Sequence, residues 1–134
     1  MEKHIDRFRP YALGFLRIVT GYMMLFHGLD KVLGIFSGKP VPLTSLLGIG
    51  GVLELVLGFL VLIGLATRLA AFVLSGEMAV AYFMFHGLGG NIFFPYVNKG
   101  ELAALYAFVL FLFAFTGSGA LAIDNLIGKK DKSL

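Results

Sequence analysis

The stretch G-V-L-E-L-V-L-G-F-L-V-L-I-G-L, residues 51–65, holds a single charged side chain, Glu54, among residues that are otherwise apolar or glycine. It belongs to a longer apolar run over 43–65. The chain has three further runs of this kind, at 11–29, 69–85 and 102–123. Because a helix of about 20 residues crosses a hydrocarbon core of roughly 30 Å, each run is suited to span a membrane. The sequence therefore predicts an all-α integral membrane protein, folded as an antiparallel four-helix transmembrane bundle.

The composition agrees with this prediction. Of the 134 residues, 58% are hydrophobic and 14% are charged, and only Arg17, Glu54 and Glu77 place a charge inside the four runs. A soluble helical bundle would show a polar face on every helix, so the pattern excludes a soluble domain. We expect one transmembrane domain over 10–126, between a cytoplasmic segment at 1–9 and a basic cytoplasmic tail at 127–134.

The residue types also exclude several chemistries. The chain has no cysteine, which rules out disulfides, thiolate nucleophiles and cysteine-ligated metals. Its net charge is only +3, and the basic residues are scattered, so nucleic acid is not an expected partner. The expected partner is the lipid bilayer.

The distribution of lysine and arginine predicts the orientation in the membrane. Seven of these residues fall on the side of the two termini: Lys3, Arg7, Arg9, Arg68, Lys129, Lys130 and Lys132. Three fall on the other side: Lys31, Lys39 and Lys99. Since basic residues in short loops stay in the cytoplasm, we expect a multi-pass protein with both termini cytoplasmic.

The three intramembrane charges are the main candidates for chemistry. Counting along each helix at 1.5 Å per residue places Arg17 about 10 Å deep, Glu77 about 13 Å and Glu54 about 16 Å, so we expect one cluster. An Arg17–Glu54 ion pair would only fix the packing of the helices. The second glutamate leaves two carboxyl groups for one arginine, so one glutamate is expected to hold its proton. Such a group suits proton transfer to a quinone or proton-coupled transport, and both readings stay open.

Glycines flank this cluster. Gly21 follows Arg17 at helical spacing, and Gly58 lies one turn beyond Glu54. Small residues let a neighbouring helix or a flat ligand come close, so both glycines are candidates for cofactor binding. The same glycines would also suit contact between protomers, which leaves a homo-oligomer open.

A second polar group is expected at the outer ends of the helices. His27 and Asp30 share one helix face, and His86 ends the third run. The spacing suggests a carboxylate–histidine metal site or axial haem ligation, but nothing fixes a ligand count. We therefore predict no metal and keep His27 and His86 as candidate cofactor contacts.

Structural roles are expected for Asn98, Glu101 and Asp124. Asn98 is suited to cap the helix that begins near Glu101. Asp124, at the predicted end of the fourth helix, is expected to pair with Arg68 or Arg9.

Successive blocks of the sequence resemble the DoxX family of membrane proteins. The blocks are R-I-V-T-G from Arg17, H-G-L-D-K from His27, E-L-V-L-G-F-L-V-L-I-G-L-A-T-R from Glu54, G-E-M-A-V-A-Y from Gly76, N-K-G-E-L-A-A-L-Y from Asn98 and G-S-G-A-L-A-I-D from Gly117. They occur in order over about residues 13–126, which is more specific than any single block.

The resemblance implies a four-helix protein of the bacterial inner membrane, related to the membrane subunit of thiosulfate:quinone oxidoreductase. Its recurrent polar positions would here be Arg17, His27, Lys31, Glu54, Glu77, Arg68, Asn98, Glu101 and Asp124. The implied chemistry is electron transfer to quinone. Because the chain lacks cysteine, any step on a sulfur substrate would need a soluble or membrane-bound partner subunit.

The resulting hypothesis is a component of a membrane redox complex that binds quinone or another lipid-soluble ligand. Arg17 would stabilise negative charge on a quinone oxygen, and Glu54 or Glu77 would supply the proton, which makes these three residues the predicted catalytic group. The alternative is a membrane scaffold or a small proton-coupled transporter, with no enzyme activity.

Overall fold

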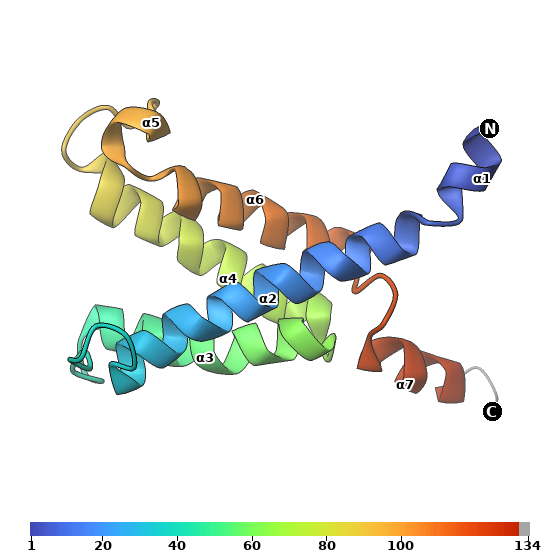
Figure 1. Ribbon diagram of the computed structural model, residues 1–134. Helices are drawn as coiled ribbons and strands as arrows, with labels where there is room; N and C mark the ends of the chain where they lie inside the picture. The colour runs from blue at the N-terminus through green and yellow to red at the C-terminus, as the bar shows by residue number, and fades with distance from the viewer. Residues whose placement is uncertain (132–134) are drawn as a thin grey trace.

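The computed structural model describes the backbone of residues 1–131 and the side chains of residues 1–128, and within this part the protein is helical with no strand (Figure 1). The elements are α1 (Glu2–Asp6), α2 (Arg9–Leu33), α3 (Leu46–Ile63), α4 (Thr67–Ala81), the π-helix η1 (Tyr82–Gly87), α5 (Pro95–Asn98), α6 (Glu101–Thr116) and α7 (Ile123–Asp131). The end of the predicted basic tail, 132–134, lies outside the described residues.

Three helical stretches are long and apolar enough to cross a membrane: Glu2–Leu33, Leu46–Ile63 and Thr67–Gly87. The fourth predicted run forms α6, which is equally apolar in character but has only 16 residues. The four runs are therefore all helices, and three of them have spanning length.

The predicted helix ends differ from the observed ones. The run predicted as 102–123 stops at Thr116 because Gly117 and Gly119 take positive φ values of 81° and 68°, and the chain then begins the separate helix α7. Helix α2 continues past residue 29 until Gly34, whose φ of 66° ends it. Helix α3 starts at Leu46 because the Ser45 hydroxyl accepts a hydrogen bond of 3.1 Å from Gly48 N, which is a typical N-cap.

The helices associate as two pairs, α2 with α3 and α4 with α6 (Figure 1). The pairs cross near the end of the molecule that carries both termini, here called the terminal end. They diverge toward the opposite end, here called the loop end, which carries the connections 34–45 and 88–100.

Glycine explains how closely α2 and α3 pack. A Cβ atom at Gly21 would lie 2.4 Å from Leu62 N, and one at Gly28 would lie 2.3 Å from Leu55 N. A Cβ at Gly58 would lie 2.9 Å from Leu25 N on the other helix. The space beside Gly21 and Gly58, which was predicted to admit a neighbouring helix or a flat ligand, is thus filled by the backbone of the partner helix.

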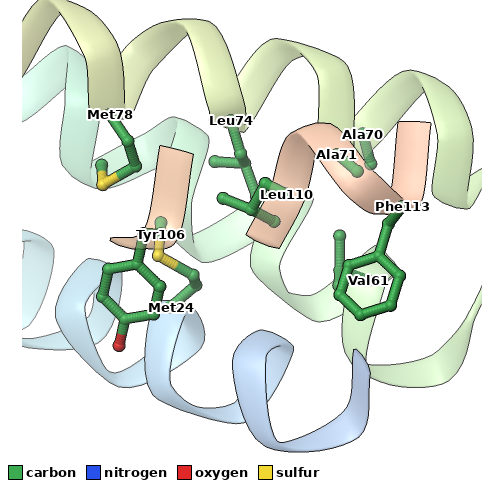
Figure 2. Packing of buried hydrophobic residues seen from close by; sticks show 9 residues of the cluster. All are labelled: Met24, Val61, Ala70, Ala71, Leu74, Met78, Tyr106, Leu110 and Phe113. Atoms are coloured by element: carbon green, nitrogen blue, oxygen red, sulfur yellow. The ribbon is translucent and has the colours of Figure 1, made fainter. Parts of the chain in front are cut away.

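The hydrophobic core joins the two pairs near the middle of the molecule (Figure 2). Leu74 of α4 and Leu110 and Phe113 of α6 are fully buried there, against Val61 of α3 and Met24 of α2. These side chains fill the space between the pairs, so the divergence toward the loop end begins beyond them.

Candidate functional site

A cavity of about 390 Å³ lies between the two helix pairs at the loop end. Its walls come from α2, α3, α4, η1 and α6, and most of its lining is apolar. Pockets for small molecules commonly fall in the range of roughly 300–1,000 Å³, so the volume is ligand-sized. Leu46 and Ile49 of α3, Phe85 of η1 and Leu102 of α6 line it and are at least half exposed, so the cavity is open to the surface of the molecule.

Lys31 and Glu54 form an ion pair that lines this cavity. The Lys31 ammonium, in the last turn of α2, lies 2.7 and 2.8 Å from the two carboxylate oxygens of Glu54. The Glu54 side chain is only 2% exposed, whereas that of Lys31 is 28% exposed, so a buried carboxylate meets a half-buried ammonium. Gly51 makes this possible, because any Cβ there would lie 2.7 Å from Lys31 Cβ. The partner of Glu54 is therefore Lys31 and not Arg17.

Glu77 adds a second carboxyl group beside this pair. Its Oε1 lies against Gly50, where a Cβ atom would be 2.7 Å away. Its Oε2 is buried and has no hydrogen-bond partner among the described residues. The charged groups that interact with Glu77 are Glu54 and Lys31. A second carboxyl group thus lies beside the Lys31–Glu54 pair in an apolar cavity, and one of its oxygens is buried without a hydrogen-bond partner in the described residues.

Tyr106 and the two predicted histidines complete the polar lining. Tyr106 is 5% exposed, and Figure 2 shows its ring directed from α6 toward α2. The exposed His27 ring packs edge-on against it, with ring centroids 6.0 Å apart. His86 lines the cavity from η1, and its Nδ1 lies 3.1 Å from Asn98 O. His27 and His86 therefore both line the cavity, and their role as cofactor contacts stays a prediction.

The predicted cluster of Arg17 with Glu54 and Glu77 is wrong. Arg17 is fully buried at the terminal end, where its guanidinium donates to the carbonyl oxygens of Ser118, Ala120 (3.0 Å) and Leu121 (2.7 Å). These acceptors exist because the chain leaves helical geometry after Thr116. Depth along a helix was therefore a poor guide, since Arg17 faces a turn that the sequence pattern had assigned to a helix.

The other charged side chains at the terminal end, Asp124 and Arg68, also bond to backbone groups. Asp124 accepts hydrogen bonds from Ala66 N (2.8 Å) and Thr67 N (3.0 Å), at the start of α4. Arg68 donates to the carbonyls of Ala114 and Phe115. The predicted pairing of Asp124 with Arg68 or Arg9 is wrong. Arg9 lies 2.6 Å from Asp6, on the surface.

Asp30 and Asn98 are also used by the fold. The Asp30 carboxylate accepts hydrogen bonds of 2.8 Å from Phe36 N and Ser37 N, which orders the loop after α2. Asn98 Oδ1 accepts a hydrogen bond of 2.8 Å from Gly100 N, the residue before α6, so it supports the start of that helix. Within the described part of the chain, no group of three potential metal-ligating side chains comes together.

Sequence reasoning underrated two residues of the cavity. Lys31 was assigned to a loop-end surface because it follows the apolar run 11–29, yet α2 carries it one turn further. Tyr106 was not singled out at all. The signal was present, because Tyr106 is the only aromatic residue with a polar tip in the run 102–123.

Apolar helices of spanning length around a ligand-sized cavity define the class as an all-helical membrane protein with an internal cavity. The sequence pattern of the DoxX family matches residues 12–87, which include Lys31, Glu54, Glu77 and His86. A protein of Haemophilus influenzae strain Rd, described as uncharacterized, is 46% identical over 136 residues, covering 95% of this chain and 98% of that protein. The chain belongs to the DoxX family. No solved structure matches it significantly.

Proposed function

We propose that this protein binds a quinone, or a lipid-soluble ligand of similar chemistry, in the loop-end cavity and serves as a component of a membrane redox complex. The observation that carries the proposal is the Lys31–Glu54 ion pair with Glu77 beside it, in an apolar cavity that no side chain fills. A positively charged group stabilises negative charge developing on a quinone oxygen, and a carboxyl group exchanges the accompanying proton. Lys31 takes the role that the sequence had given to Arg17.

The setting we propose is the bacterial inner membrane, with α6 as the fourth span of an antiparallel bundle. Its 16 residues measure about 24 Å, and the flanking turns extend it. The excess of lysine and arginine at the terminal end supports cytoplasmic termini and a loop end on the opposite side. The exposed apolar side chains that line the cavity, such as Leu46 and Ile49, would then be in contact with lipid, which suits a ligand that arrives from the bilayer.

Transport is less well supported by the geometry. A proton-coupled transporter needs a polar path that can open to both sides of the membrane. Here the fully buried Leu74, Leu110 and Phe113 separate the cavity from the terminal end. Apolar side chains therefore close the route from the two carboxyl groups to the terminal end.

The scaffold alternative has an observation of its own in favour. The side chains of Arg17 and Ser75 donate hydrogen bonds to backbone carbonyls of other segments, and the Ser75 Oγ to Ala107 O distance is 2.7 Å. Polar residues in the membrane thus serve packing at these positions. A scaffold predicts the same role for Lys31 and Glu54.

The test is to purify the protein in mild detergent and measure bound quinone by mass spectrometry and by the oxidised-minus-reduced ultraviolet spectrum. We expect about one quinone per chain in the wild type. Glu77→Gln and Lys31→Met should lower retention about tenfold or more, because the first removes the ionisable carboxyl group and the second the cation of the cavity wall. The matched controls are Glu101→Gln and Lys39→Met, whose side chains are exposed and outside the cavity.

The result that contradicts the proposal is a folded wild type that retains no quinone and binds none when it is added back. Loss of yield in Lys31→Met and Glu54→Gln, rescued when the two charges are exchanged, would then favour the scaffold.

A further inference from the structure

The hydrogen bond of His86 determines what its other ring nitrogen can do. Nδ1 lies 3.1 Å from the carbonyl oxygen of Asn98. Because a carbonyl oxygen only accepts, Nδ1 must carry the hydrogen. In the neutral imidazole the other nitrogen, Nε2, is then an acceptor with a free lone pair. Within the described part of the chain Nε2 has no hydrogen-bond partner, and the ring lines the cavity.

The local structure holds this ring in place. His86 lies in the π-helix η1, a rare form that often occurs at functional sites. The Tyr82 hydroxyl donates to Ile92 O at 2.6 Å and accepts from Asn98 Nδ2 at 3.0 Å, so the loop that supplies Asn98 O is tied to η1. The Tyr82 ring also packs against the His86 ring, with centroids 6.4 Å apart. The acceptor is therefore preorganised.

Other walls of the cavity supply donors. The ammonium of Lys31 has three hydrogens, and the contacts with Glu54 account for two of them. Tyr106 lines the cavity, and its hydroxyl has no hydrogen-bond partner in the described residues. Lys99 also lines the cavity, but it is exposed and its ammonium lies over the Tyr96 ring, 5.8 Å from the centroid. The cavity thus presents donors from α2 and α6 and an acceptor from η1.

We propose that His86 Nε2 accepts a hydrogen bond from a ring hydroxyl of the ligand, so that the cavity prefers the hydroxylated form, a hydroquinone or a phenol, over the matching quinone. The inference rests on the proposed function and deepens it by naming the favoured form of the ligand. A quinone carries only acceptor oxygens and leaves Nε2 unpaired. A hydroquinone satisfies Nε2 with one hydroxyl and accepts from Lys31 or Tyr106 with its other oxygen. Sites built to pair with a hydroxyl discriminate against analogues that lack it.

The experiment measures the affinities of one short-chain alkyl-1,4-benzohydroquinone, its benzoquinone and its dimethyl ether, under anaerobic conditions, for protein in nanodiscs. We expect the wild type to bind the hydroquinone about tenfold more tightly than either analogue. His86→Phe keeps a ring of similar size without nitrogen, so its ratio should fall close to one. His86→Gln places an amide oxygen near the position of Nε2 and should retain most of the preference.

The matched control is His4→Phe, at an exposed histidine of α1 outside the cavity, which should leave the ratio unchanged. Equal binding of quinone and hydroquinone by the wild type overturns the inference and leaves the proposed function standing. An equal loss of affinity for all three probes in His86→Phe also overturns it, because that result indicates a structural role. A wild type that binds none of the probes overturns the proposed function as well.

Discussion

Replacing Arg17 with methionine is expected to destabilise the terminal end of the protein without changing the ligand chemistry of the cavity. The guanidinium donates to three backbone carbonyls, those of Ser118, Ala120 and Leu121, and Arg17 has no exposed surface. One hydrogen bond to a charged group is worth about 1.5–3 kcal/mol. Because the freed carbonyls regain some water at the end of the molecule, we expect the free energy of unfolding to fall by about 3–5 kcal/mol rather than by the full sum.

The assay is unfolding in mixed micelles with increasing sodium dodecyl sulfate, followed by far-ultraviolet circular dichroism. Arg17→Lys should recover part of the loss, because it keeps the charge but not the planar fork that reaches several acceptors. Ligand retention per folded molecule should match the wild type in both variants. A destabilisation below about 1 kcal/mol would refute the conclusion that the hydrogen bonds of Arg17 stabilise the turn at 118–121. A stable, folded Arg17→Met protein that loses the ligand would refute the separation of Arg17 from the site.

Three further predictions follow from the packing and the cavity. Gly28→Leu should lower the unfolding free energy by at least about 1–3 kcal/mol, since a Cβ there would lie 2.3 Å from a backbone nitrogen of α3. In the control Gly76→Ala, the added Cβ has no atom within 4 Å, so the substitution should be neutral or slightly stabilising. Asp124→Ala removes the acceptor at the start of α4 and should cost about 0.5–2 kcal/mol by thermal unfolding, while Asp6→Ala, in an exposed pair, should stay within about 0.5 kcal/mol. Ala103→Phe places a ring in the cavity and should abolish ligand retention, measured by mass spectrometry, while the protein stays folded; retention at the wild-type level would mean that the ligand binds elsewhere.

The length of the apolar runs was enough to predict the four long helices, because four runs separated by glycine, proline and charge leave few other arrangements, but it did not predict the short helices α1, α5 and α7. They could not predict the end of α6. Thr116 is followed by Gly117 and Gly119, and whether such glycines stay helical depends on tertiary contacts, here the guanidinium of Arg17 beneath the turn. The π-helix at Tyr82–Gly87 left no signal in the apolar pattern, since its side chains are as hydrophobic as those of the preceding helix.

The candidate site was predicted in part. Glu54 and Glu77 were singled out because a buried carboxylate needs an explanation, and both line the cavity. Their cation was misassigned because Arg17 and Lys31 lie fourteen residues apart on one helix, and depth alone did not tell which of them faces the glutamates. The direction in which a side chain leaves its helix depends on the neighbouring helix. Here Gly51 gives Lys31 that access.

Leu74, Leu110 and Phe113 form a buried apolar layer, here called the plug, between the cavity and the terminal end. This layer affects how a membrane voltage acts on the cavity. A transmembrane voltage falls mainly across the region of low dielectric constant, and moving one elementary charge through the whole drop takes about 2.3 kcal/mol per 100 mV. A charge that moved between the cavity and the terminal end would have to cross the part of this drop that falls over the plug. A proton exchanged between Glu77 and the loop end does not cross the plug, so its transfer should depend less on the membrane potential than transfer to the terminal end would.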